Sequence, residues 1–234
     1  MERKTIYLCL AHMSEDGIEQ KYVKEAFDTN WVVPLGPNVN GFEADLEAFV
    51  GEDKKVVALS AGTAAVHLAL IACGVQAGDE VCVQSFTFCA SSHPITYLGA
   101  TPVFIDSERD TWNMDPELLE KAIVERKMVT GSYPKAIIPV ALYGMPYDCE
   151  RIMAVADKYG IPVIEDAAEG MGSRFDGKVL GTFGRFGVLS FNGNKMITTS
   201  GGGALICRSK EDADNIMWHA TQARDSYPYY QFVF

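Results

Sequence analysis

The chain has 234 residues, which is enough for one large domain or two small ones. It carries 20 Lys and Arg residues against 31 Asp and Glu residues, and the resulting net charge of −11 argues against a partner that is nucleic acid or an anionic membrane. Hydrophobic residues make up 48% and charged residues 22%, which excludes a disordered chain and leaves enough apolar material for a sizeable core.

The sequence predicts a cytoplasmic protein without a membrane span. No apolar run approaches the roughly 20 residues that cross a bilayer, and residues 1–7 lack the apolar region of a signal peptide. The cysteines are widely scattered, with no C-x-x-C pair, so we expect them to be reduced and mostly buried, and we expect no metal site. They are Cys9, Cys73, Cys82, Cys89, Cys149 and Cys207.

Residues 1–50 are predicted to form an N-terminal helical arm. A first helix follows Ser14, a candidate N-cap, because apolar residues recur there at helical spacing: Ile18, Tyr22, Ala26 and Phe27. Residues 31–37 contain two prolines and a glycine, which forbid a regular helix. We expect a second helix to begin at Asn40, with Glu43 completing a capping box. Its apolar stripe consists of Phe42, Leu46 and Phe49.

From Val56 onward, short apolar runs alternate with helical segments. The runs typical of buried strands are 56–59, 81–83, 102–105, 136–140, 162–164 and 187–191. The expected helices are 64–72, 116–124 with Asp115 as its N-cap, and 148–159 closed by Gly160. Strands that are apolar throughout, alternating with amphipathic helices, indicate a parallel sheet covered on both faces. We therefore predict an α/β fold over residues 51–234, a three-layer αβα arrangement with a mostly parallel sheet.

Ligands of such sheets bind beyond the carboxyl ends of the strands, and the stretch 60–65 (SAGTAA) lies at one of these ends. Small residues let the backbone approach a ligand, and the free N–H groups of a helix N-terminus favour an anion. Thr63 adds a hydroxyl donor. Taken alone, a tight turn with a Thr cap is the simpler interpretation of this stretch.

Two further polar stretches follow apolar strands. Glu165 and Asp166 close one strand, so one carboxylate is expected at the ligand face, although N-capping by Asp166 is the commoner fate of an acid there. Lys195 follows another strand, and a lysine in a partly desolvated cleft can form a Schiff base. A solvated loop lysine is the alternative. The triplet 201–203 (GGG) indicates a close backbone approach or a forced turn.

Together the three stretches match the needs of pyridoxal phosphate. This cofactor requires an anion cradle, a carboxylate for its protonated ring nitrogen and an amine for its aldehyde. It also requires a flat surface against its ring, and residues 84–88 (QSFTF) offer two aromatic side chains after a strand. The alternative for these two is core packing, the usual fate of Phe.

Several motifs in this order resemble the sugar-nucleotide aminotransferases of the DegT type. These belong to the fold type I (aspartate aminotransferase-like) pyridoxal-phosphate superfamily, and the resemblance covers residues 6–230. The matching motifs are 59–65 (LSAGTAA), 85–88 (SFTF), 140–146 (VALYGMP), 165–169 (EDAAE) and 190–203 (SFNGNKMITTSGGG). Several ordered motifs at family spacing are more specific than any one of them.

The resemblance implies roles for individual residues. Lys195 is similar to the lysine that holds the cofactor as a Schiff base and shuttles the proton. Asp166 is similar to the partner of the pyridine nitrogen. Phe88 occupies the position of the aromatic residue that stacks on the ring, and Glu169 the position close to the phenolic oxygen.

The implied phosphate cradle comes from two segments of the chain. Gly62, Thr63 and Ala64 supply one side of it, and Ser190 supplies the other.

The resemblance also implies an activity. A member of this family transfers an amino group from glutamate to a nucleotide-linked 4-keto-6-deoxy sugar, acts as a homodimer, and serves surface-polysaccharide or glycan biosynthesis. A glutamate at position 169 resembles the residue that the branches making UDP-linked bacillosamine precursors or GDP-perosamine carry there. A relative that dehydrates the sugar at C3 carries histidine in place of the lysine, so Lys195 argues against that reaction.

Family chains are longer and continue into a small C-terminal domain, which we expect to be largely missing here. The chain ends on an apolar segment, residues 229–234 (YYQFVF). An alternative function follows from this expectation: an inactive fragment that retains only cofactor binding or subunit association.

Overall fold

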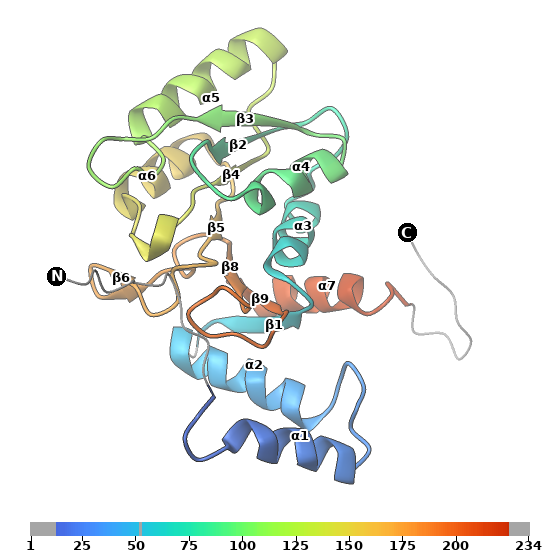
Figure 1. The fold of residues 1–234 in the computed structure, drawn as a ribbon. Helices are drawn as coiled ribbons and strands as arrows, with labels where there is room; N and C mark the ends of the chain where they lie inside the picture. Colours follow the sequence, from blue (N-terminus) through green and yellow to red (C-terminus); the bar gives the residue numbers. More distant parts are fainter. Residues whose placement is uncertain (1–12, 52, 225–234) are drawn as a thin grey trace, which may run out of the picture.

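The structure is a computed structural model that describes residues 13–51 and 53–224 (Figure 1). Two hydrogen-bonded sheets, β1-β9-β8-β5 and β3-β2-β4, meet edge to edge, because Ile137 bridges Val163 and Val140 bridges Asp166. The strands are β1 (Lys55–Leu59), β2 (Glu80–Gln84), β3 (Thr101–Ile105), β4 (Ala136–Ile138), β5 (Ile164–Asp166), β8 (Phe186–Ser190) and β9 (Gly203–Cys207). A separate short hairpin consists of β6 (Arg174–Phe175) and β7 (Lys178–Val179).

The sheet is mostly parallel, as predicted. β2 runs parallel to both β3 and β4, and β5 runs parallel to β8. β9 is antiparallel to both of its neighbours, β1 and β8. Because β9 reverses between them, β1 and β8 point the same way, and their carboxyl ends reach the same edge of the sheet.

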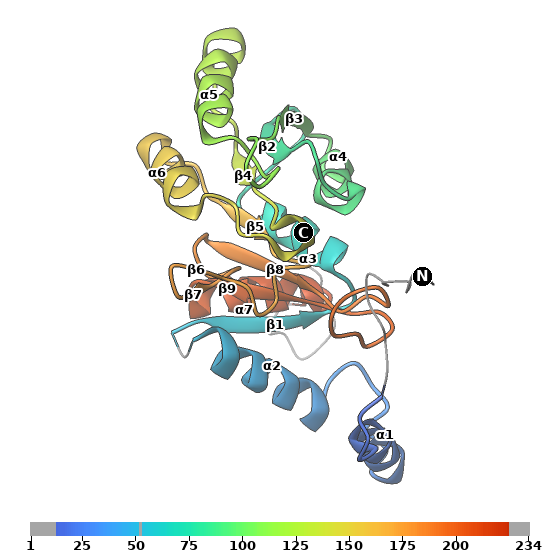
Figure 2. The same cartoon turned by 60° about the vertical axis from the view of Figure 1, so that its left-hand side comes forward.

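Helices cover both faces of the sheet, which confirms the α/β class. The helices are α1 (Ile18–Asp28), α2 (Pro37–Val50), α3 (Gly62–Ala72), α4 (His93–Tyr97), α5 (Pro116–Thr130), α6 (Cys149–Tyr159) and α7 (Lys210–Ala220), with two 3-10 turns, η1 (Cys89–Ser91) and η2 (Leu142–Gly144). α2, α5 and α6 supply the core of one face, and α3, α4 and α7 supply the core of the other (Figure 2).

Strand side chains alternate between these two cores. Val56 lies in the core that contains α5 and α6, whereas the next residue, Val57, lies in the core that contains α3. Ile206 and Leu205 of β9 divide in the same way. β1 and β9 therefore pack against helices on both faces, as expected for strands with apolar sequences.

Two predicted caps are confirmed. The Asp115 carboxylate accepts from the Glu117 N–H over 2.7 Å and from the Leu118 N–H over 3.2 Å, which starts α5. Gly160 closes α6 with a φ of 65°, a left-handed conformation that glycine adopts without strain. α5 continues to Thr130, six residues beyond the predicted end at Val124.

The start predicted for the second helix is wrong. α2 begins at Pro37, with Gly36 as its N-cap, because proline is favoured in the first helical turn. Glu43 forms no capping box with Asn40, since its carboxylate accepts from the Ala58 N–H over 2.8 Å and ties α2 to β1. The first helix has Gly17 as its N-cap rather than Ser14.

The described part of the predicted arm contains two helices that differ in burial. α1 has no buried residue, whereas α2 contributes Leu46 and Val50 to the core. The division of the chain at residue 50 stays a prediction.

Within the described residues, no helix is both long and apolar enough to cross a membrane. The described cysteines are all free, and Cys89 alone among them is exposed. Cys9 and the apolar segment 229–234 lie outside the described residues.

Candidate active site

The predicted polar stretches meet at the edge where β1, β5 and β8 end. A cavity of about 580 Å³ lies there. It is lined by most of the residues that the resemblance assigns to the cofactor: Gly62, Thr63, Phe88, Asp166, Glu169, Ser190 and Lys195. Ala64, one residue further into α3, does not line it.

The N-terminus of α3 opens into this cavity. No side chain among the described residues caps this helix at Ala61, so the N–H groups of its first turn keep their partial positive charge. Gly62 allows α3 to pack closely on β8, because a Cβ at that position would lie 3.0 Å from the Cβ of Ser190. The helix end and the Ser190 hydroxyl therefore form a site suited to an anion.

Lys195 lies in the loop between β8 and β9. The loop turns directly after β8, because the Lys195 N–H donates to the Asn192 carbonyl over 2.9 Å. The Nζ atom of Lys195 lies 3.2 Å from Oε1 of Glu169, and the lysine side chain is 14% exposed. A lysine paired with one carboxylate in a cavity differs from the solvated loop lysine that was the alternative.

The glycine triplet brings this loop back into β9. Gly202 has a φ of 154°, and a Cβ there would lie 2.5 Å from Oγ1 of Thr199. At Gly203 a Cβ would lie 2.3 Å from the carbonyl carbon of Ala61. The close backbone approach predicted for the triplet is confirmed, because β9 passes directly against the start of α3.

Asp166 ends β5 and is buried. Its Oδ2 accepts from the Ser91 hydroxyl over 2.5 Å, and its Oδ1 accepts from the Ala168 N–H over 3.1 Å. Burial raises the pKa of Asp166, and the Ser91 hydroxyl, the Ala168 N–H and Lys195 oppose that rise. Residues 167–173 form turns rather than a helix, so the helix-cap interpretation is wrong for this acid.

The neighbouring acid, Glu165, faces the interior of the protein. Its carboxylate accepts backbone N–H bonds from Gly181 at 3.0 Å, Phe183 at 2.6 Å and Gly184 at 2.7 Å. Burial raises the pKa of Glu165, while these N–H groups oppose the rise. Successive strand residues point to opposite sides, so Asp166 serves the cavity and Glu165 holds the loop that precedes β8.

Phe88 lines the cavity with a side chain that is 74% exposed. Phe86 lines it too and makes an edge contact with Trp112, with ring centroids 5.9 Å apart. The core alternative is therefore wrong for both phenylalanines, and the Phe88 ring is free to contact a ligand.

Tyr143 and Ser91 are site residues that were not predicted from the sequence. Tyr143 lines the cavity at a φ of 52°, and its N–H donates to Oε2 of Glu169 over 2.8 Å. Such backbone strain is common at functional sites. The motif 140–146 contains Tyr143, but Ser91 stands among small residues that carry no signal of their own.

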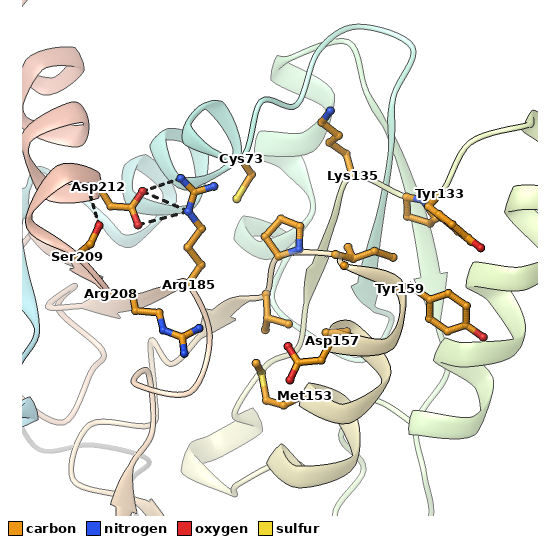
Figure 3. A pocket seen from close by; sticks show the side chains of 16 residues that line it. Cys73, Tyr133, Lys135, Met153, Asp157, Tyr159, Arg185, Arg208, Ser209 and Asp212 are labelled. Carbon is orange, nitrogen blue, oxygen red and sulfur yellow. Dashed lines mark hydrogen bonds and ion pairs between the residues drawn. The ribbon is translucent and has the colours of Figure 1, made fainter.

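A second cavity, of about 740 Å³, lies near the residues that precede β4, β5 and β8. Figure 3 shows Arg185 in this cavity, where its Nη2 bonds Oδ1 of Asp212 over 2.6 Å. No residue of the five motifs lines it, and Asp212 already satisfies this arginine. The cavity at the carboxyl ends is therefore the candidate active site.

Comparison with known proteins shows which family this chain resembles. The DegT/DnrJ/EryC1/StrS aminotransferase family matches residues 13–230. A Bacillus subtilis (strain 168) protein named "Putative pyridoxal phosphate-dependent aminotransferase EpsN" is 53% identical over 228 residues, 97% of this chain and 58% of the relative. GDP-perosamine synthase of Escherichia coli O157:H7 is 40% identical over 204 residues, 87% of this chain and 54% of the relative.

A third relative carries a different kind of name. UDP-2-acetamido-2-deoxy-3-oxo-D-glucuronate aminotransferase of Pseudomonas aeruginosa is 41% identical over 192 residues, 82% of this chain and 51% of the relative. The chain thus spans a little over half the length of each of these relatives.

Solved structures share the fold. A DegT DnrJ EryC1 StrS aminotransferase from Brucella abortus superposes with a TM-score of 0.83 at 32% identity, over 95% of this chain and 62% of that one. NtdA from Bacillus subtilis, solved with bound cofactor PMP, gives a TM-score of 0.83 at 29% identity, over 95% of this chain and 49% of that one. These structures and the family match over residues 13–230 show that the chain belongs to the DegT/DnrJ/EryC1/StrS aminotransferase family, whose cofactor is pyridoxal phosphate.

Proposed function

We propose that this protein transfers amino groups to nucleotide-linked sugars with pyridoxal phosphate as its cofactor. The observation that carries the proposal is the joint position of Lys195, Asp166 and the open end of α3. They lie 29 or more residues apart in the chain, yet they line one cavity. Membership of an aminotransferase family supports this assignment.

The donor set of the cavity fits the cofactor. The uncapped first turn of α3 and the Ser190 hydroxyl offer donors to a phosphate. Asp166 offers a carboxylate to a protonated ring nitrogen, and Lys195 offers an amine to an aldehyde. The exposed Phe88 ring offers a flat apolar surface. Ala64 does not line the cavity. We therefore assign no role to its side chain, and we propose that only its backbone N–H contributes to the phosphate site.

Pyridoxal phosphate, when bound, supplies an aldehyde that condenses with amines and a protonated ring that withdraws electrons. Asp166, in its ionised form, holds the proton on the ring nitrogen, because an opposite charge nearby favours the charged state. With the cofactor bound, Lys195 Nζ would be the base that accepts the proton from the α-carbon of the amino donor and returns it to complete the transfer. Glu169 orients this amine from 3.2 Å and fixes the Tyr143 backbone with its other oxygen.

The proposed acceptor is a 4-keto-6-deoxy sugar nucleotide, and the proposed amino donor is glutamate. Similarity to GDP-perosamine synthase supports the acceptor, and Glu169 is the residue type of that branch. A second candidate acceptor is a 3-oxo sugar nucleotide, because the Pseudomonas aeruginosa relative that carries 3-oxo in its name is 41% identical. The assignment of glutamate rests on the family resemblance.

A substrate panel tests this proposal. The purified protein, loaded with cofactor and supplied with glutamate, is offered GDP-, UDP- and dTDP-linked 4-keto sugars and a UDP-linked 3-oxo sugar, and amino sugars are detected by mass spectrometry. We expect product from a 4-keto sugar, and none with Lys195→Ala. Product from the 3-oxo sugar alone would mean that the acceptor is a 3-oxo sugar nucleotide rather than a 4-keto sugar nucleotide. No product from any of them, by a protein that binds the cofactor, would favour the non-catalytic fragment.

The proposal includes a cytoplasmic homodimer that serves polysaccharide biosynthesis. Several large apolar side chains of α1 and the segment after it are exposed, and exposed patches of this kind mark association sites. They are Ile18, Tyr22, Val23, Phe27, Trp31, Val32, Val33 and Leu35.

A further inference from the structure

Ser91 occupies an unusual position at the candidate active site. Its side chain is fully buried in η1, the turn directly after Phe88. Its Oγ lies 2.5 Å from Oδ2 of Asp166, a residue 75 positions further along the chain. On the other side, the same Oγ lies 2.8 Å from Oγ1 of Thr87. Thr87 itself lines the cavity, so two hydroxyl groups connect the cavity wall to the buried carboxylate.

The Ser91 hydroxyl donates to Oδ2 of Asp166, and the ionised form of this carboxylate admits no other direction, because an ionised carboxylate only accepts hydrogen bonds. The Ser91 oxygen then accepts from the Thr87 hydroxyl. Hydrogen bonds to a charged group are about twice as strong as neutral ones, and bonds in a chain strengthen one another. The two hydroxyls therefore favour the ionised carboxylate over the protonated one.

Other groups also face Asp166. The Ala168 N–H and Lys195 favour the ionised form, whereas Glu169 and burial oppose it. Among the favourable groups, the Ser91 hydroxyl has the largest effect on the pKa of Asp166. It is also the shortest contact of the carboxylate.

We propose that Thr87 and Ser91 form a positioning relay, which orients the Asp166 carboxylate and offsets part of the cost of burying its ionised form before a cofactor binds. The purpose of the relay rests on the proposed function, because a protonated ring nitrogen needs an ionised partner. The relay itself is a property of the cofactor-free chain, so it can be tested without the cofactor.

The test is a titration of Asp166 in cofactor-free protein labelled with ¹³C-aspartate. The side-chain carboxyl resonance is assigned with Asp166→Asn and followed by NMR as the pH changes. Ser91→Ala and the nearly isosteric Ser91→Cys should each raise the proton-binding constant of Asp166 about tenfold, because each removes a strong hydrogen bond to a charge. Thr87→Val should raise it by a smaller factor, since it removes only the outer hydroxyl.

Ser92→Ala is the matched control. Ser92 follows Ser91 directly, but its hydroxyl bonds the Cys89 carbonyl over 3.2 Å and does not contact Asp166. We expect wild-type titration in this variant. Circular dichroism establishes that each variant is folded.

Two outcomes would overturn the inference. If folded Ser91→Ala and Ser91→Cys proteins titrate at Asp166 like wild type, Ser91 only ties η1 to β5. If Ser92→Ala shifts the titration as much as the Ser91 variants do, loosening of η1 explains the effect. Failure of the proposed function has a separate signature, since a protein that never captures pyridoxal phosphate on Lys195 would still report the Asp166 titration.

Discussion

Burial and hydrogen bonding act in opposite directions on the carboxyl group of Asp166. Burial prevails and raises its pKa above that of the unfolded chain, so the folded protein holds this proton more tightly. The stability that this gives is full below the unfolded pKa, about 4, and is lost as the pH rises through the folded value. Asp166→Asn removes this pH-dependent loss of stability, because asparagine does not titrate. We expect the free energy of unfolding of the cofactor-free wild type to fall relative to the variant as the pH rises from about 4.

Urea unfolding of both proteins at several pH values measures this difference. A difference that stays constant with pH would show that the pKa of Asp166 is the same in the folded and the unfolded chain. With cofactor bound, the same variant should transaminate about 100-fold more slowly or worse, the usual loss when a positioned electrostatic partner is removed. Near-native turnover would mean that Asp166 does not face the ring nitrogen.

Part of the site could be predicted from the sequence, because some of its residues stand next to apolar strands that are recognisable from the local sequence. Lys195 and Asp166 each follow an apolar strand, and parallel strands bring such residues to one edge. The different fates of Glu165 and Asp166 were not predictable from their shared motif, because they depend on the alternation of strand side chains against a loop 16 or more residues away. Ser91 was missed for a similar reason, since its role arises only when η1 packs on β5.

The open N-terminus of α3 provides a second prediction. If this helix end and Ser190 bind the cofactor phosphate, Ser190→Ala should raise the Kd for pyridoxal phosphate by about tenfold or more, because a bond to a charged group is lost. Stability should change little, since the Ser190 hydroxyl has only a long contact of 3.5 Å with the Asn192 N–H. Fluorescence titration and urea unfolding give the two quantities.

Ser209→Ala is the matched control for this substitution. Ser209 caps α7 by accepting from the Asp212 N–H over 3.1 Å, so its loss should cost about 1 kcal/mol of stability. Its effect on the Kd should be negligible, because it lies in the second cavity rather than the first. Equal cofactor affinity in Ser190→Ala and wild type would remove Ser190 from the phosphate site.

The elements themselves were predicted where apolar periodicity and caps agreed. α5 and α6 have Asp N-caps and glycine closures, and β1, β2 and β3 are continuous apolar runs. β9 and α7 were not predicted, because the glycine triplet was interpreted as a close backbone approach or a forced turn rather than as the start of a strand, and β9 begins at its last glycine. The antiparallel direction of β9 is a tertiary property that no local pattern encodes.

At the level of the assembly, α1 and the segment after it offer the candidate dimer surface. We expect light scattering to show a homodimer, and we expect Tyr22→Glu combined with Phe27→Glu to produce monomers. These side chains are 52% and 68% exposed, so the substitutions should leave the fold intact while placing charge in an apolar contact.

Met128→Glu is the control, because Met128 is 75% exposed on α5, which lies at the opposite end of the molecule from α1 (Figure 1). It should remain dimeric. A wild-type protein that is monomeric with cofactor bound, or a control that dissociates as readily as the double variant, would contradict this assignment of the interface.

Covalent capture of the cofactor shows directly whether Lys195 is the residue that binds pyridoxal phosphate. The protein is incubated with pyridoxal phosphate, reduced with borohydride, digested and analysed by mass spectrometry. We expect one labelled residue, Lys195, together with a visible absorbance band before reduction and neither signal in Lys195→Ala. Label on another lysine, or equal labelling of wild type and Lys195→Ala, would contradict this expectation.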